Sequence, residues 1–168
     1  MHFIKARRVQ RPTQISLQAS SLYLAAFFAA TALGQLFAFE TYPEILRSYG
    51  ISFVSDLALP ISALLVALEV FAIPALLWMT LSPLMRVVSK LSGWTVLVYW
   101  LVVGVWQSVA DFTISNAGLF GAKVHLPQGW WLVSYALILL ILMTYVTFGS
   151  RFSSRAAKHK THAAAKAS

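Results

Sequence analysis

Four long apolar segments divide the chain, and each has the length of a membrane-spanning helix. They lie near residues 20–39, 57–81, 92–110 and 129–148. A helix needs about 20 mostly apolar residues to cross the hydrocarbon core of a bilayer, because each residue advances about 1.5 Å. The pattern predicts an all-α fold: an integral membrane four-helix bundle over residues 19–149, between polar tails at 1–18 and 150–168.

The basic residues indicate how these helices are oriented. Of the 13 Lys and Arg residues, 11 lie in the two tails and in the loop between the second and third segments. Loops rich in Lys and Arg stay on the cytoplasmic side of a membrane. We therefore expect a multi-pass protein of the cell membrane with both termini in the cytoplasm. The net charge of +8 then reflects topology, and no nucleic-acid partner is expected. The C-terminal tail lacks apolar periodicity, so we expect it to be mobile.

Composition narrows the chemistry further. The chain is 59% hydrophobic and only 11% charged, which excludes an ordinary cytosolic or disordered protein. It has no cysteine, so it cannot form a disulfide or attack a substrate through sulfur.

His159 and His162 lack a third ligand nearby in sequence, so we predict no metal site. The predicted loops on the outer side show no nucleophile, base and orienting group together, and an enzyme acting alone is the least expected reading.

Glu69 is the one full charge inside a predicted span. Counting from the start of its segment places it about 14–20 Å deep, near the bilayer midplane. An acidic residue such as Asp costs roughly 2.5–3.5 kcal/mol there, so Glu69 must face protein, water or a ligand. A hydrogen bond across the bundle, a proton, quinone or cofactor role, and partner docking all remain open for it. Pro74 removes a helical hydrogen bond nearby and predicts a kink.

Three further polar residues form two layers with Glu69 when depth is counted along each segment. Tyr99 of the third segment matches the depth of Glu69, while Gln107 matches Gln35 of the first segment. We therefore predict that Glu69 pairs with Tyr99 at mid-depth and that Gln35 pairs with Gln107 nearer the outer surface. Together the four residues make a candidate intramembrane polar site.

Small residues indicate where helices approach closely. Ala26, Ala30 and Gly34 recur every fourth residue, so they share one face of the first helix. On the third segment Gly104 lies on the same stripe as Gln107. We predict that these four positions serve helix packing.

The two loops expected on the outer side also carry patterns. Ile45, Leu46 and Tyr49 follow helical spacing and predict a short interfacial helix in the first of them. The segment 117–121 contains two glycines and predicts a turn at the outer surface.

These features together resemble the DoxX/MauE-like family of small four-helix membrane proteins. The similarity spans roughly residues 20–148 in order and in membrane position. The matching elements are Gly34-Gln35-Leu36, the stretch Tyr42 to Ile51 with its Tyr-Gly-Ile ending, Leu59-Pro60 followed by Glu69, and Ala117-Gly118-Leu119-Phe120-Gly121, which is similar to the Cys-Gly-Cys-Phe-Gly element of the MauE branch.

The resemblance implies a non-catalytic accessory or subunit of an extracytoplasmic redox or cofactor-maturation system. Its partners would be a thioredoxin-like or other redox protein, or other membrane subunits. This chain departs from the family at Ala117 and Leu119, which replace the cysteines, and at Gln35, where many relatives have Lys. Thiol–disulfide exchange by this chain itself is therefore excluded.

Two other readings remain open. The first is a small transporter or proton-conducting protein that uses Glu69, and the second is a structural partner subunit whose small-residue faces bind other spans. No cofactor is predicted. A quinone stays open, because it needs only an apolar slot and a hydrogen-bond donor, which Glu69, Tyr99 or Trp100 could supply.

Overall fold

The computed structural model describes residues 12–109, 118–121 and 129–166. Every regular element within these ranges is a helix. In chain order the helices are α1 (Pro12–Phe37), α2 (Tyr42–Arg47), α3 (Ser52–Asp56), α4 (Ala58–Leu76), α5 (Pro83–Val109) and α6 (Trp130–Lys166).

Four helices in the described part are long and apolar enough to cross a membrane, which confirms the all-helical, multi-pass prediction. These are Ile15–Phe37, Ala58–Leu76, Pro83–Val109 and the first part of α6, Trp130–Gly149. Their lipid-facing sides carry many exposed apolar side chains, such as Leu64 and Ile141. The chain is therefore suited to a lipid environment.

The ends of the helices differ from the predicted spans for local reasons. α4 ends at Leu76, two residues after Pro74, and Trp78 then adopts a positive φ of 58° that no helix continues through. α5 begins already at Pro83, where the hydroxyl of Ser82 caps it by accepting a hydrogen bond from the Met85 amide at 3.3 Å. The predicted kink at Pro74 stays a prediction.

The C-terminal tail is helical. α6 continues past its apolar part to Lys166, through the segment for which the sequence predicted mobility. That mobility stays a prediction. The basic N-terminal tail before residue 12 lies outside the described residues.

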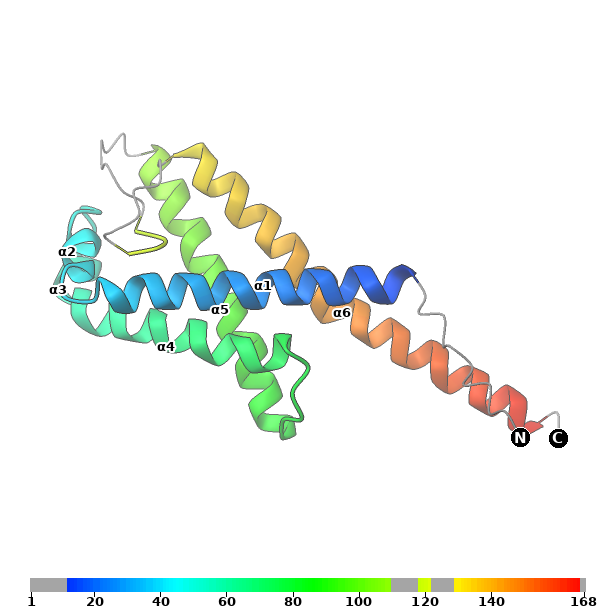
Figure 1. The fold of residues 1–168 in the computed structure, drawn as a ribbon. Coiled ribbons are helices and arrows are strands. Elements are labelled where there is room, and N and C mark those ends of the chain that lie inside the picture. Colours follow the sequence, from blue (N-terminus) through cyan, green and yellow to red (C-terminus); the bar gives the residue numbers. More distant parts are fainter. Residues whose placement is uncertain (1–11, 110–117, 122–128, 167–168) are drawn as a thin grey trace, which may run out of the picture.

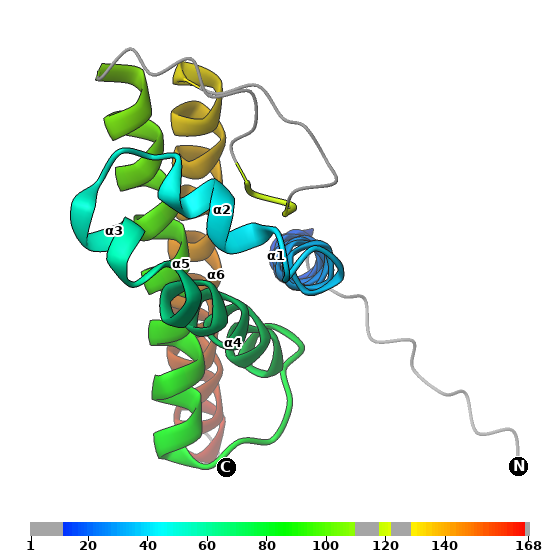
Figure 2. The same cartoon turned by 90° about the vertical axis from the view of Figure 1, so that its left-hand side faces the viewer.

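The long helices form two pairs that cross steeply. In Figure 1, α1 and α4 lie side by side and run across the view, while α5 and α6 slant behind them. Figure 2, turned by 90°, shows α1 and α4 almost end-on and α5 and α6 upright. α4 packs against both α1 and α5, so the middle of α4 lies where the two pairs meet.

One end of this crossing is covered by two short helices and a turn. α2 and α3 pack on the start of α4, and the turn Gly118–Gly121 packs against α1 and α2. We call α2, α3, the residues that connect them and this turn the cap. α2 occupies the place of the predicted short helix, with Tyr42 and Leu46 fully buried. A position of α2 at the membrane interface stays a prediction.

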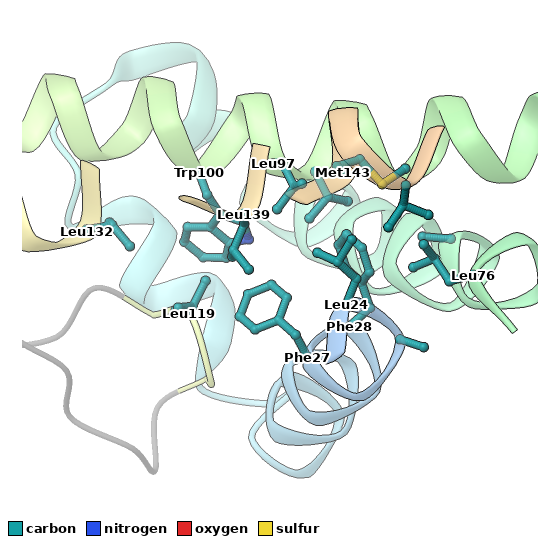
Figure 3. Packing of buried hydrophobic residues seen from close by; sticks show 14 residues of the cluster. Leu24, Phe27, Phe28, Leu76, Leu97, Trp100, Leu119, Leu132, Leu139 and Met143 are labelled. Carbon is teal, nitrogen blue, oxygen red and sulfur yellow. The ribbon is translucent and has the colours of Figure 1, made fainter. Parts of the chain in front are cut away.

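The apolar core fills the space between the two helix pairs. Figure 3 shows side chains from four long helices and from the turn meeting there. Its members include Leu24, Phe27 and Phe28 of α1, Leu76 of α4, Leu97 and Trp100 of α5, Leu132, Leu139 and Met143 of α6, and Leu119 of the turn.

The small residues of the first span serve packing only in part. Ala26 and Ala30 are exposed, so the prediction that they pack is wrong within the described chain. The contact face of α1 instead carries Leu24, Phe28 and Thr31. This happens because larger apolar side chains, rather than the small ones, meet the helices that cross α1.

Gly34 and Gly104 do lie at close approaches. A Cβ atom at Gly34 would lie 2.7 Å from the carbonyl oxygen of Phe120, and one at Gly104 would lie 3.2 Å from Val133 Cγ2. Gly121 is the counterpart of Gly34, because a Cβ there would lie 2.6 Å from the Gly34 oxygen. The backbone of the turn therefore rests directly on the backbone of α1.

This contact predicts unequal effects for two glycine substitutions. Both Gly121 (φ 73°) and Gly129 (φ 87°) hold left-handed backbone, but a Cβ at Gly129 meets nothing closer than Ser108 Oγ at 4.0 Å. Gly129→Ala should lose about 1–2 kcal/mol of unfolding free energy from backbone strain. Gly121→Ala should lose a further 1–3 kcal/mol, roughly, from the clash with α1. Unfolding in detergent micelles measures both, and equal losses would mean that the turn does not rest on α1.

Candidate site: a buried polar cluster around Glu69

Glu69 lies in the middle of α4 and is fully buried. Its Oε1 accepts a hydrogen bond from Gln35 Nε2 of α1 at 3.0 Å. The side chains of Thr31 on α1 and Trp100 on α5 also lie against the carboxyl group. The acid is thus sheltered by protein groups from two neighbouring helices, as its burial requires.

Gln35 makes a second contact that reaches the cap. Its Nε2 also donates to the carbonyl oxygen of Leu119 at 3.3 Å. The turn that presents this carbonyl is closed by a hydrogen bond from the Gly121 amide to the Gly118 oxygen at 3.0 Å. One amide group therefore joins α1, α4 and the cap.

The pairings predicted from depth are wrong. Tyr99 Oη has no hydrogen-bond partner, and neither amide atom of Gln107 has one at hydrogen-bonding distance and angle within the described chain. Gln35 and Glu69 instead pair with each other. Side chains on a helix tilt toward its N-terminus, and α1 and α4 run in opposite directions. The Gln35 and Glu69 side chains therefore reach toward each other and close the gap between the two predicted layers.

Tyrosines from the cap extend the cluster away from Glu69. Tyr42 and Tyr49 are fully buried, and they pack with Tyr99 in a second apolar group beneath α2. Tyr42 lies within electrostatic range of Glu69, and Tyr49 lies against Gln107. The Tyr49 carbonyl oxygen accepts a hydrogen bond from Trp106 Nε1 at 3.3 Å.

The two cap tyrosines are neutral hydrogen-bonding groups. Burial raises the pKa of Tyr42 well above its usual value, and the neighbouring Tyr49 raises it further. Burial likewise raises the pKa of Tyr49, with a further contribution from Tyr99. Both hydroxyls therefore keep their protons at any physiological pH and can act as donors.

Several buried polar atoms of this cluster lack a protein partner in the described residues. Buried polar groups usually have one, and each exception calls for an explanation. The unpaired atoms are Gln35 Oε1, Tyr42 Oη, Glu69 Oε2, Tyr99 Oη, Trp100 Nε1 and both amide atoms of Gln107. They include donors and acceptors, so the cluster is able to bind a small polar species.

The segment predicted as a turn forms one in its described residues, and its place at the outer surface stays a prediction. Gly118, Leu119 and Gly121 form a turn, but they are buried against α1 and α2. Phe120 is half-buried, and Ala117 lies outside the described residues. The turn lies inward because the absent side chains of Gly34 and Gly121 leave room for their backbones to touch.

Sequence reasoning missed Thr31 and Tyr42 as members of the cluster. Thr31 lies one helical turn before Gln35 and on the same face, and this spacing within an apolar span was the available signal. Tyr42 had no comparable signal, because its place depends on how the cap folds back over the long helices. Among the described residues, no group of three or more His, Cys, Asp or Glu side chains is arranged to hold a metal ion.

Comparison with known proteins adds no relative. No protein-family model, curated protein or solved structure matches the chain. The site is therefore interpreted from its own geometry.

The Gln35–Glu69 hydrogen bond predicts coupled effects of substitution. Gln35→Met should lower the unfolding free energy by about 1–3 kcal/mol, because it leaves Glu69 and the Leu119 carbonyl without their donor. In the double variant Gln35→Met/Glu69→Met, the loss of unfolding free energy should be about 0.5–3 kcal/mol smaller than the sum of the two single losses. Unfolding in mixed micelles measures this. Leu36→Met, at an exposed position of the same helix, is the matched control, and strictly additive losses would contradict the bond.

Proposed function

We propose that the chain is a DoxX/MauE-like integral membrane protein. In this proposal it is a non-catalytic accessory or subunit of an extracytoplasmic redox or cofactor-maturation system. Both termini lie in the cytoplasm, so the cap lies at the outer face of the cell membrane. The partner is a redox or thioredoxin-like protein on that side, or another membrane subunit.

The observation that carries this proposal is the double hydrogen bond of Gln35. It fastens the turn of the cap to the buried acid of α4, so the cap is held in a fixed place over the long helices. Short loops fastened in this way give a partner protein a preformed surface, which lowers the entropy lost on binding. The described part of the cap also exposes Phe53 on α3, with 68% of its surface accessible.

The resemblance supplies the redox half of the proposal. It rests on the residues around Gly34, Tyr42, Glu69 and Gly118, and these four positions meet in one region of the structure. Motifs that are distant in sequence and close in space are what a shared site would require. Topology and role make separate predictions, because a fold can host more than one function.

A proton-conducting protein is the second candidate. Glu69 Oε2 is buried without a partner, which is the feature that such a protein would need. Conduction also requires a polar route on both sides of the acid.

The topology predicts which positions react from outside the cell. The chain has no cysteine, so single cysteines can be introduced without a background. Ser48→Cys, exposed after α2, should react with a membrane-impermeant maleimide in intact spheroplasts. Thr80→Cys, exposed between α4 and α5, should react only after the membrane is permeabilised. The opposite pattern would place the termini outside and contradict the proposal.

The accessory role predicts a specific loss in a deletion strain of the source organism. Without this chain, extracytoplasmic redox proteins should lack part of their bound cofactor, measured from absorption spectra of that fraction. The wild-type chain and the lipid-facing variant Leu64→Ala should restore the spectra, whereas Gln35→Met should restore them poorly. Unchanged spectra in the deletion strain would refute the accessory role.

A further inference from the structure

Within the described residues, the unpaired buried polar atoms extend from Glu69 toward the cap. Besides Glu69 itself, they belong to Gln35, Tyr42, Tyr99, Trp100 and Gln107. Tyr42 lies within electrostatic range of Glu69, Tyr99 packs in the same apolar group as Tyr42, and Gln107 lies against Tyr49. The groups thus follow one another from the buried acid into the cap.

On the other side of Glu69, the described side chains are apolar or have hydrogen-bonding groups that pair with protein atoms. Figure 3 shows Leu24, Phe28 and Leu76 packed together, away from Leu119 of the cap. The buried hydroxyls of three serines on that side donate to backbone oxygens. Ser21 donates to Leu76, Ser89 to Ala72, and Ser92 to Val88.

We infer that ordered water occupies the cap side of the cluster and that Glu69 exchanges its proton with the aqueous phase through the cap, and through the cap alone. Unpaired buried polar atoms are commonly satisfied by internal water, each molecule making about three hydrogen bonds. In a membrane this need is greater, because lipid offers no alternative partner. The apolar packing between Glu69 and the far end of α4 closes the route on that side.

The chemistry of the lining groups suits water. Trp100 Nε1 and the Gln107 amide nitrogen are donors, Gln35 Oε1 and Gln107 Oε1 are acceptors, and the tyrosine hydroxyls are both. Neutral groups of both kinds match a molecule that donates and accepts, and they match a bare cation poorly.

The exchange is a proton transfer in which no electrons move. The carboxyl O–H of Glu69 gives its proton to a neighbouring water, and the carboxylate takes one back from the same water chain. The side chains that lie against the acid are Thr31 and Gln35 from α1 and Trp100 from α5, and Tyr42 of α2 is within electrostatic range. None of them is a cation, and Tyr42 is the one titratable group among them.

Infrared spectroscopy of the full chain in nanodiscs tests the exchange directly. The carboxyl stretch present in the wild type and missing in Glu69→Gln belongs to Glu69. We expect that band to shift when the buffer is changed to D₂O. The shift should be several-fold slower in the near-isosteric double variant Tyr42→Phe/Gln107→Met. Met143→Leu, on the apolar side, should exchange at the wild-type rate. No Glu69 band at any pH, no shift, or equal rates in all three proteins would overturn the inference.

Two further measurements do not depend on the folding of the double variant. Proteoliposomes of the wild type should show no proton flux above empty vesicles, and flux abolished by Glu69→Gln would overturn the one-sided route. Tyr99→Phe should leave thermal stability unchanged or lower, because a hydrated hydroxyl loses a water hydrogen bond. A raised melting temperature would mean that the hydroxyl is dry and unsatisfied, which would overturn the presence of water. Neither result depends on the accessory role proposed above.

Discussion

The arrangement of the polar site depends on one constraint: a carboxyl group buried among apolar helices must have partners inside the protein. Lipid offers none, and an unpaired charged or polar group there costs several kcal/mol, on the order of the stability of a small domain. Glu69 meets this constraint through Gln35, whose amide nitrogen also holds the Leu119 carbonyl. The requirement of a single acid thereby fixes where α1, α4 and the cap meet.

The contact between Gly34 and Gly121 also positions the polar site. Leu119 reaches Gln35 only because the turn comes down onto the backbone of α1. A side chain at either glycine would lift the turn away. The glycines therefore act on the polar site without being polar, and the segment that contains Gly118 and Gly121 has a structural role that needs no cysteine.

Sequence could predict the long helices and the burial of Glu69, because both follow from the length of an apolar run and from the cost of charge in lipid. It could not predict the partner of Glu69. Depth counted along each segment treats helices as parallel rods and places each side chain at the level of its own Cα. The real helices cross steeply, and the Gln35 and Glu69 side chains tilt toward each other from antiparallel helices. Tyr42 was not predicted as a neighbour of Glu69, because its position depends on how the cap packs against the long helices.

The one-sided distribution of unpaired groups separates two roles that a buried acid can have. A carboxyl group that conducts must meet water from both faces, whereas one that only binds a proton needs a single route. In this chain the hydroxyls of Ser21 and Ser89 on the far side of Glu69 are already bound to backbone oxygens, while Tyr42 and Tyr99 on the cap side are not bound to protein. With the one-sided route inferred above, Glu69 binds and releases a proton without conducting it across the membrane.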